Sequence, residues 1–394
     1  MSEENTDTRG GVGQLAADAR LRRRRRAERR FRGICVGALL LAGAFLVLFL
    51  GSMVVAAYPA FTQTEVKVEV DFTDPDQAWR AIDPELNSIV SRGVTRMLPN
   101  RLENNPDLAG QRLEEWVLAK AEIDQHRKGK ESLEDELRER VERLEEADRF
   151  RYVFNHWLFT EGDSKLPEMA GLKAAIVGSI YVLALTLAFA FPVGVLSAIY
   201  LEEFAPDNRF TQAIEININN LAAVPSILFG LLGLAIMINF FGVPRSSAIA
   251  GGLTLGLMTL PIVIISTRAA LRAVPHAIRE GAIAMGATRW QTVRDHVLPM
   301  SLPGILTGTI IGLAQAMGET APLLLIGMVA YIPDVPTSVT DAATVMPAQI
   351  FSWASMPQQA FTERTAAAIL VLLTVLIALN ATAVYLRRKF ERRW

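Results

Sequence analysis

The sequence predicts an all-α membrane protein that crosses the bilayer six times and carries one sizeable domain outside it. Hydrophobic residues make up 51% of the 394 residues, and the formal net charge is only −1. Charge is strongly segregated, because residues 60–170 are rich in acidic and basic side chains and several later runs are almost free of them. Apolar runs of about 20 residues are typical of membrane-spanning helices, and six such runs predict six spans.

The first apolar run, residues 33–58, is long enough to cross the hydrocarbon core with some tilt. The basic stretch RLRRRRRAERRFR precedes it at residues 20–32. A signal peptide would have an apolar core of only roughly 7–15 residues, so we expect the run to remain as an anchor. Clustered arginines can also bind nucleic acid, but a cluster directly before a span favours a topology signal that keeps the tail, residues 1–32, in the cytoplasm.

Five further apolar runs follow, near residues 171–200, 212–241, 246–270, 301–330 and 365–386. An even number of spans returns the C-terminus to the cytoplasm, where the tail LRRKFERRW is basic. The loop 271–300 faces the same side and holds Arg272, Arg279, Arg289 and Arg294. The opposite loop, 331–364, contains one arginine and no lysine. The positive-inside rule therefore predicts that both termini are cytoplasmic.

Residues 59–168, between the first two spans, are expected to form a small extracytoplasmic domain. The stretch TEVKVEVDF at 64–72 alternates as a strand does. The segment 111–150 is expected to be helix-rich, and apolar residues recur along it in steps of three and four. These residues are Leu133, Leu137, Val141 and Leu144. They predict an amphipathic helix that packs on the domain or on a partner, with a short coiled coil as the alternative.

The charged loop 275–299 predicts two short helices joined by a tight turn. Its first residue, a proline, can open the first helix, and Gly286 permits the left-handed backbone that ends it. Thr288 can cap the second helix, which Pro299 is expected to close before the next span. Such a loop suits docking into a cleft of a cytoplasmic partner, and an amphipathic connector resting on lipid is the alternative. A DNA-reading role is disfavoured because both ends are tied to spans.

The loop resembles the EAA loop of ABC-importer permeases. The pattern is Glu-Ala-Ala, three residues, Gly, nine residues, Ile, one residue and Leu-Pro. The matching residues here are Glu280, Gly281, Ala282, Gly286, Leu298 and Pro299. The chain departs from the pattern at Gly281, which replaces the first alanine, and at His296, which replaces the isoleucine. Gly281 is expected to weaken the first helix by up to about 1 kcal/mol relative to alanine.

Three other stretches narrow the resemblance to the PstA-type permease of the phosphate ABC importer. They lie at residues 218–234, 253–264 and 302–327, and the last contains GETAPLL. The resemblance covers roughly residues 170–390. It implies a type I ABC importer (MetI-like) permease core over 169–394 in the bacterial inner membrane. The domain at 59–168 is longer than the usual loop of this family.

The membrane runs contain polar residues that are candidates for the translocation pathway. An ionisable group inside the membrane is costly unless it faces protein or water, so Glu319 is a candidate gate residue, with a structural ion pair as the alternative. Gln315, four residues earlier, is expected to share its helix face. Many PstA-like chains have arginine there, and Arg268 can supply positive charge instead. Asn220 adds a polar group near the third span, where Pro225 can break the helix.

A stripe of small residues follows one face of the fifth predicted span. It consists of Gly304, Gly308, Gly312 and Ala316. Small residues at this spacing let two helices approach closely. The stripe predicts packing within the chain, with a dimer seam as the alternative.

The sequence contains no residue pattern for covalent chemistry. Cys35 is the single cysteine, the four histidines are far apart, and no P-loop is present. The chain is therefore expected to be non-catalytic and to hold no metal or cofactor, with ATP and Mg bound by a partner ATPase. The resemblance implies a PstC-type permease, a PstB-type ATPase dimer and a PstS-type phosphate-binding protein as partners, besides membrane lipid and without nucleic acid.

The resemblance implies a permease subunit that forms half of the translocation pathway of an ATP-driven phosphate importer and couples to the ATPase through its EAA loop. Three alternatives remain open. They are a type I importer permease for another oxyanion or small solute, a membrane-anchored scaffold or sensor, and a secondary transporter driven by an ion gradient.

Overall fold

The computed structural model describes residues 8–73, 81–328 and 331–390 and divides into two compact units, one up to Val55 and one from Ala56 onward. The first unit is formed by α1, Thr8–Ala57, a continuous helix that includes most of the basic tail. With the turn that follows it, this helix provides the candidate span Ala27–Phe61, in which an 18-residue window has a mean hydropathy of 2.7. The two ends of the chain used to predict orientation lie partly outside the described residues.

The second unit begins with a small domain built on a three-stranded antiparallel sheet of order β2-β1-β3, which we call the sheet domain (residues 62–154). Val66, Val68 and Val70 of β1 point into its core, as the alternation of the sequence predicts. The strands are β1 (Thr62–Asp71), β2 (Arg112–Leu118) and β3 (Phe150–Phe154). The helices and 3-10 turns are η1 (Tyr58–Phe61), η3 (Pro84–Ser88), α2 (Arg92–Asn104), η4 (Pro106–Leu108), α3 (Ala121–Arg127) and α4 (Asp135–Glu146).

The sheet domain is less helical than expected. Residues 112–118 lie in the segment expected to be helix-rich, yet as β2 they pair with residues 65–71 of β1. Their Glu, Leu and Arg content favours a helix locally, and pairing with β1 overrides that preference. The predicted amphipathic stripe from Leu133 to Leu144 does form, and it packs on the core of the domain itself.

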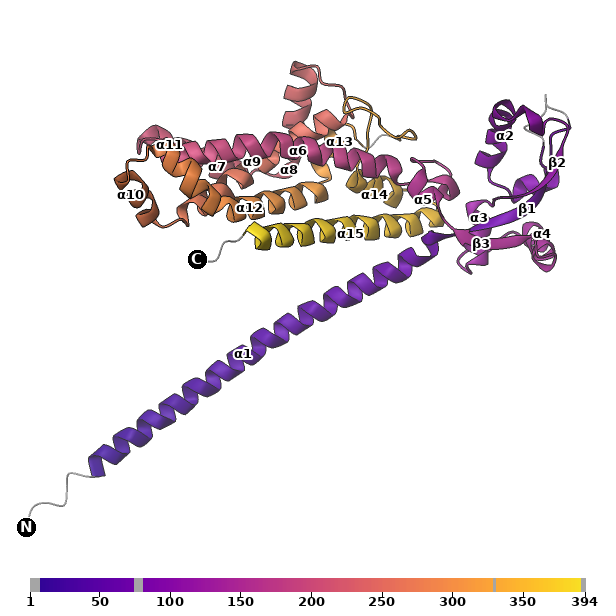
Figure 1. Cartoon of the computed structure of the whole chain (residues 1–394). Coiled ribbons are helices and arrows are strands. Elements are labelled where there is room, and N and C mark those ends of the chain that lie inside the picture. The colour runs from indigo at the N-terminus through magenta and orange to yellow at the C-terminus, as the bar shows by residue number, and fades with distance from the viewer. Residues whose placement is uncertain (1–7, 74–80, 329–330, 391–394) are drawn as a thin grey trace, which may run out of the picture. The chain divides into compact units, whose positions relative to one another are not determined.

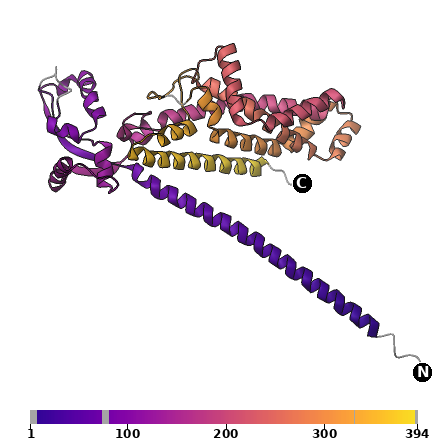
Figure 2. The same cartoon turned by 180° about the vertical axis from the view of Figure 1, so that it is seen from behind.

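The remaining chain is helical and contains the other candidate spans, whose long helices α6, α9, α12 and α15 run side by side (Figures 1 and 2). The long helices are α6 (Lys173–Ile199), α7 (Arg209–Ala222), α9 (Ala248–Arg272), α12 (Leu298–Gly318) and α15 (Gln359–Phe390). The shorter helices are α5 (Trp157–Thr160), α8 (Ser226–Leu232), α10 (His276–Ala284), α11 (Arg289–Thr292), α13 (Ala321–Leu325) and α14 (Met346–Ala354). A 3-10 turn, η5 (Pro167–Met169), and three π-helical segments, η6 (Tyr200–Phe204), η7 (Gly233–Phe240) and η8 (Val293–Val297), complete the described part.

Five helices among the described residues are long and apolar enough to span a membrane, and a bent pair raises the number to six. The bent pair, Arg209–Ala222 and Ser226–Phe240, turns by 105°. It occupies the run 212–241, which the sequence predicts as one span. Pro225 stands at the break in an extended conformation (φ −54°, ψ 134°) and cannot continue the preceding helix.

The small-residue stripe of α12 packs within the chain. A Cβ atom built on Gly308 would lie 2.2 Å from the side chain of Ser266, and one on Gly304 would lie 2.7 Å from Cβ of Ala270. Both neighbours belong to α9, so the stripe lets α9 and α12 approach closely.

Candidate functional site

The predicted loop helices form at the end of the helical core. Backbone nitrogens of Gly286 and Ala287 donate to carbonyls of α10, and Gly286 has φ +88°, which closes the helix. No atom lies within 4 Å of a Cβ built there, so backbone conformation alone requires glycine. Thr288 caps α11 through a reciprocal capping box with Gln291.

The second loop helix does not end where the sequence predicts. The chain passes from α11 through the π-helical segment Val293–Val297 directly into α12, so that residues 289–318 form one continuous helix. Pro299 therefore lies inside this continuous helix, directly after the π-helical segment, and does not close a separate helix.

Arg279 of α10 fixes the loop to two spans. Its guanidinium donates to the carboxylate of Glu203 at 2.6 Å and to the backbone carbonyls of Leu271 at 2.9 Å and Val274 at 2.7 Å. The last two carbonyls belong to the C-terminal end of α9, and Glu203 follows α6. One half-buried, five-donor side chain thus ties α10 to both helices. From the sequence, Arg279 is expected only to add to the positive charge of the loop.

A small hydrophobic core supports the same connection. Leu271 and Val274 of the α9 end pack with Val293 and Val297 of the loop and with Ile199 of α6, all five buried. Leu298, one of the predicted coupling residues, is half-buried against this cluster. The base of the loop is therefore packed like a protein interior, and a displacement of α10 is transmitted to the spans.

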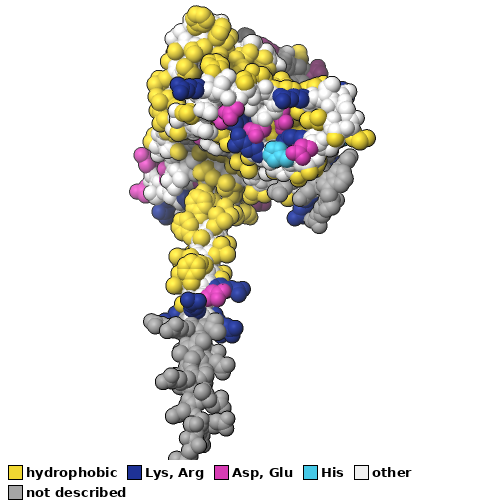
Figure 3. Space-filling view, turned by 90° about the vertical axis from the view of Figure 1, so that its left-hand side faces the viewer, with side chains coloured by type: hydrophobic (Ala, Val, Ile, Leu, Met, Phe, Trp, Pro, Cys, Tyr) yellow, Lys and Arg dark blue, Asp and Glu magenta, His cyan; other side chains and the backbone are white. Residues whose placement is uncertain are grey.

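The tip of the loop carries exposed hydrophobic side chains. Met285 is 89% exposed, Trp290 55% and Ile283 53%. Figure 3 looks onto this end of the helical core and shows basic, acidic and histidine side chains close to hydrophobic ones. Apolar groups rimmed by charge are typical of a surface that binds another protein. The predicted coupling residues Glu280 and Gly281 are exposed on the same loop.

The remaining predicted coupling residues have different surroundings. Ala282 is half-buried, Gly286 occupies the turn, and Pro299 is exposed. Only part of the EAA pattern is therefore accessible to a partner, and the other part shapes and anchors the loop.

Arg268 lies in a charge cluster near the C-terminal end of α9. Its guanidinium contacts Glu215 of α7 at 2.5 Å and Glu202 at 3.2 Å, and Glu202 also pairs with Arg272 at 2.8 Å. The positive charge of Arg268 is thus matched by two carboxylates. An anion that approached Arg268 would compete with both.

The other predicted pathway residues do not gather around Arg268. Helix α12 ends at Gly318, and Glu319 is extended with ψ 129°, so Gln315 and Glu319 do not share a helix face as expected. Gln315 and Asn220 are exposed and Glu319 is half-buried in the isolated chain. No hydrogen bond or ion pair joins these side chains to one another in the described part of the chain. Asn220 lies near the C-terminal end of α7, immediately before the 105° bend.

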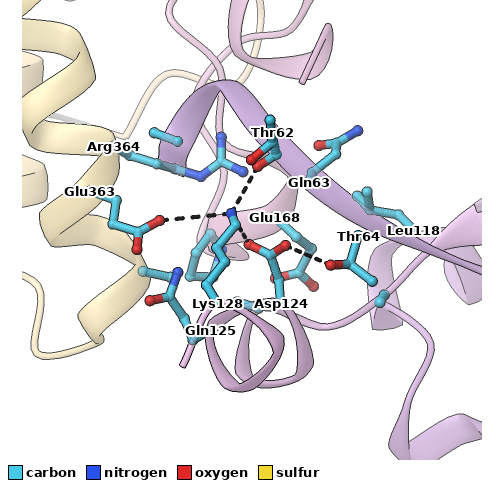
Figure 4. Close-up of a pocket in the computed structure, with 15 residues that line it drawn as sticks. Thr62, Gln63, Thr64, Leu118, Asp124, Gln125, Lys128, Glu168, Glu363 and Arg364 are labelled. Atoms are coloured by element: carbon cyan, nitrogen blue, oxygen red, sulfur yellow. Dashed lines mark hydrogen bonds and ion pairs between the residues drawn. The ribbon is translucent and has the colours of Figure 1, made fainter. Parts of the chain in front are cut away.

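A second cluster of buried charges joins the sheet domain to the start of α15 (Figure 4). Nζ of Lys128 contacts Asp124 at 2.5 Å and Glu363 of α15 at 3.8 Å, and it donates to two backbone carbonyls of the segment 59–62 at 2.8 Å each. Lys130 pairs with Glu363 at 2.6 Å. The Lys128, Asp124 and Glu363 side chains are 9%, 14% and 5% exposed, so this is a buried network and not a surface pair.

The same junction encloses a small polar cavity. Arg364, buried beside Glu363, donates to the carbonyl of Ala170 at 2.7 Å. The side-chain amide of Gln63 and the oxygen of Gln125 line the cavity without a hydrogen-bond partner in the chain. Its volume of about 20 Å³ corresponds to one water molecule, because roughly 10–15 Å³ suffices for one. The junction therefore has the character of a structural contact.

The described residues contain no group of three or more histidine, cysteine, aspartate or glutamate side chains arranged to hold a metal ion. The candidate sites above consist of packing surfaces and ion pairs.

Comparison with known proteins identifies the family to which the chain belongs. The model of the binding-protein-dependent transport system inner membrane component family matches residues 190–394, and a domain of unknown function, DUF3333, matches residues 18–85. The phosphate transport system permease protein PstA 1 of Mycobacterium tuberculosis (strain CDC 1551 / Oshkosh) is 31% identical over 58% of this chain and 75% of its own length. PstA of Haemophilus influenzae is 30% identical over 51% and 70%.

Other relatives match over a smaller part of their length. The probable ABC transporter permease protein YqgI of Bacillus subtilis is 33% identical over 42% of this chain, which spans only 56% of that relative. The match to a second Bacillus subtilis relative, the probable ABC transporter permease protein YqgH, covers 62% of the length of that relative. Among solved structures, the inward-facing MetNI methionine ABC transporter matches 56% of this chain and 97% of that chain at 18% identity, with a TM-score of 0.45.

The family model covers just over half of the residues, its match includes the loop and the helices that Arg279 joins, and the candidate spans make the chain a multi-pass inner-membrane protein. The chain belongs to the family of binding-protein-dependent transport system inner membrane components, as a homologue of the PstA permeases with a type I ABC importer permease fold.

Proposed function

We propose that this chain is a permease subunit of an ATP-driven phosphate importer and forms half of its translocation pathway. The observation that carries the proposal is the loop 275–299, whose hydrophobic tip is exposed while Arg279 fixes its base to α6 and α9. The substrate class follows from relatives that are named phosphate transport system permeases.

In this proposal both termini and the loop face the cytoplasm, and residues 59–168 form the extracytoplasmic domain. A PstC-type permease supplies the other half of the pathway, and a PstS-type protein delivers phosphate. ATP and Mg are bound by a PstB-type ATPase dimer. The chain itself is non-catalytic and holds no cofactor.

The loop then acts as the mechanical link to the ATPase. Ile283, Met285 and Trp290 enter a cleft on the ATPase, where their apolar surface is removed from water. Movement of the ATPase on binding ATP is passed to α6 and α9 through Arg279 and to α12 through the continuous helix 289–318. The spans respond by switching the pathway between outward- and inward-facing states.

The candidate pathway residues remain Glu319, Gln315, Arg268 and Asn220. Gln315 and Asn220 are exposed polar groups on apolar helices, which suits a surface that faces the second permease across a water-filled path. Arg268, balanced by Glu202 and Glu215, has a stronger case for holding α7 against α9 than for binding an anion directly.

Uptake of labelled phosphate by cells lacking this chain tests the proposal. Wild type and Gly281→Ala are expected to restore uptake, because Gly281 is exposed and a Cβ there meets no atom within 4 Å. Gly286→Pro, the matched glycine substitution, is expected not to restore it, because proline fixes φ near about −65° and Gly286 needs +88°. Equal uptake in all strains, with other phosphate systems removed and equal protein amounts, would reject the proposal.

A permease for another small anion is the second candidate. The charge of Arg268 is balanced by Glu202 and Glu215, so this residue selects neither phosphate nor another anion. Restoring the chain should raise uptake of labelled phosphate and leave uptake of labelled sulfate unchanged. The opposite pattern would reassign the substrate and leave the permease role intact.

A further inference from the structure

We propose that an aromatic cluster at the base of the sheet domain, formed by Phe61, Phe154 and Phe159, lies in the interfacial layer of the bilayer and seats the domain on lipid. The inference requires only that the spans cross a membrane. It therefore holds whether or not phosphate is the substrate.

The rings form a connected set that is open to the surroundings. The ring centres of Phe61 and Phe159 are 6.3 Å apart and nearly parallel, and those of Phe154 and Phe159 are 6.2 Å apart and parallel within 1°. Phe154 is 54% exposed and Phe159 37%. Large aromatic side chains seldom gather on a water-facing surface without a partner.

Two separate span ends fix the depth of the cluster. Phe61 is the last residue of the candidate span Ala27–Phe61. Phe159 belongs to α5, which packs on the start of α6, where the backbone nitrogens of Leu172 and Lys173 donate to the carbonyls of Leu158 and Glu161 at 2.8 and 3.0 Å. Lys173 begins the next candidate span.

The interfacial layer on each side of a bilayer is roughly 5–7 Å thick, as the difference between about 30 Å of hydrocarbon and 40–45 Å overall implies. The ring separations of 6.2 and 6.3 Å are of the same size. The Phe159 ring centre therefore lies within about one layer thickness of the ring of Phe61, which ends the first candidate span, and the Phe154 ring is its next neighbour. Aromatic rings are favoured in this layer, where one part of the side chain is apolar and another is wet.

The cluster is also held rigidly. Asn155, buried next to Phe154, donates from Nδ2 to the carbonyl of Ala60 at 2.9 Å and accepts from the nitrogen of Leu158. This side chain links the end of β3, the turn that follows α1 and the start of α5. The rings thus cannot turn away from the bilayer without unfolding the base of the sheet domain.

Spin-label accessibility in the full chain tests the inference. The single cysteine is replaced (Cys35→Ser), a nitroxide is attached through Phe154→Cys or Phe159→Cys, and the protein is reconstituted in vesicles of phosphatidylethanolamine and phosphatidylglycerol. Two labels calibrate the scale. Phe45→Cys, 72% exposed within the apolar segment of α1, reports lipid, and Glu69→Cys reports water.

Glu69 is a suitable water reference because it is exposed and lies seven residues along β1 from Thr62, or about 23 Å at roughly 3.3 Å per residue. We expect the ratio of oxygen to NiEDDA collisions at residues 154 and 159 to exceed that at Glu69→Cys and to approach that at Phe45→Cys. NiEDDA accessibility equal to that at Glu69→Cys would place the cluster in water. Exclusion of both reagents would show that protein covers it, and either result would overturn the inference.

Discussion

At the scale of single residues, the side chain of Arg279 attaches the loop 275–299 to the ends of two membrane-spanning helices. Removing its guanidinium takes the donor from the Glu203 carboxylate and the Val274 carbonyl, whereas the Leu271 carbonyl still accepts from the backbone nitrogen of Val274. An unpaired, largely buried polar group costs about 1–3 kcal/mol.

We therefore expect Arg279→Ala to abolish transport while the protein still reaches the membrane. Arg279→Lys should recover only part of the activity, because an ammonium cannot reproduce the planar fork. The exposed Arg289 offers the control, and Arg289→Ala should keep transport. Uptake normalised to the amount of protein in the membrane measures all three, and full activity of Arg279→Ala would contradict the role of this contact.

Asp163 gives a prediction about pH. Burial raises the pKa of Asp163 above its ordinary value of 3.8, although Trp353 Nε1 donates to its carboxylate at 2.8 Å and lowers it in part. A raised pKa means that the folded state holds the proton more tightly than the unfolded chain. The contribution of this group to stability is therefore present below the unfolded pKa and is lost as pH rises through the folded pKa.

Asp163→Asn keeps an oxygen acceptor for Trp353 and removes the charge. The unfolding temperature of the wild type in detergent should therefore fall relative to that of Asp163→Asn as pH rises from about 4 to 7. The exposed Asp107 provides a control, and Asp107→Asn should follow the wild type. Parallel curves for wild type and Asp163→Asn would show that Asp163 does not titrate differently on unfolding.

At the scale of elements, the junction between the sheet domain and α15 depends on the buried Lys128. Replacing Lys128 by methionine would leave Asp124 and Glu363 buried with less compensation, and breaking such a network typically costs about 3–5 kcal/mol. The exposed pair of Lys67 and Glu114 should contribute at most about 1 kcal/mol.

Hydrogen exchange followed by mass spectrometry is the sharpest readout. Lys128→Met should lose protection both in α3 and at the start of α15, whereas Lys67→Met should match the wild type. A loss confined to α3 would mean that the two elements are not held together by this contact.

Some elements could be predicted from the sequence and others could not. The hydropathy of the chain predicted the spans, and the turn residues Gly286 and Thr288 predicted the loop helices, because both signals are local. The strand β2 and the continuation of α11 into α12 were missed, since each depends on neighbours brought by the fold. The contact of Arg279 with Glu203 joins residues 76 apart, and no periodicity or motif links them.

At the scale of the whole molecule, the proposed orientation can be tested directly. In the Cys35→Ser background, an impermeant maleimide should label Glu69→Cys in intact spheroplasts and Met285→Cys only after the membrane is opened. Both positions are exposed, so access to the reagent depends on the side of the membrane. The reverse pattern would invert the orientation and remove the loop from any cytoplasmic ATPase.

The junction at the start of α15 has a consequence for biosynthesis. Lys128 and Asp124 leave the ribosome long before Glu363 and Arg364, which complete their surroundings. Until α15 has been made and packed, the sheet domain exposes a surface of unmatched polar groups that α15 covers in the folded chain. A chain truncated before α15 would keep that polar surface exposed, and proteases that remove incomplete proteins can recognise it.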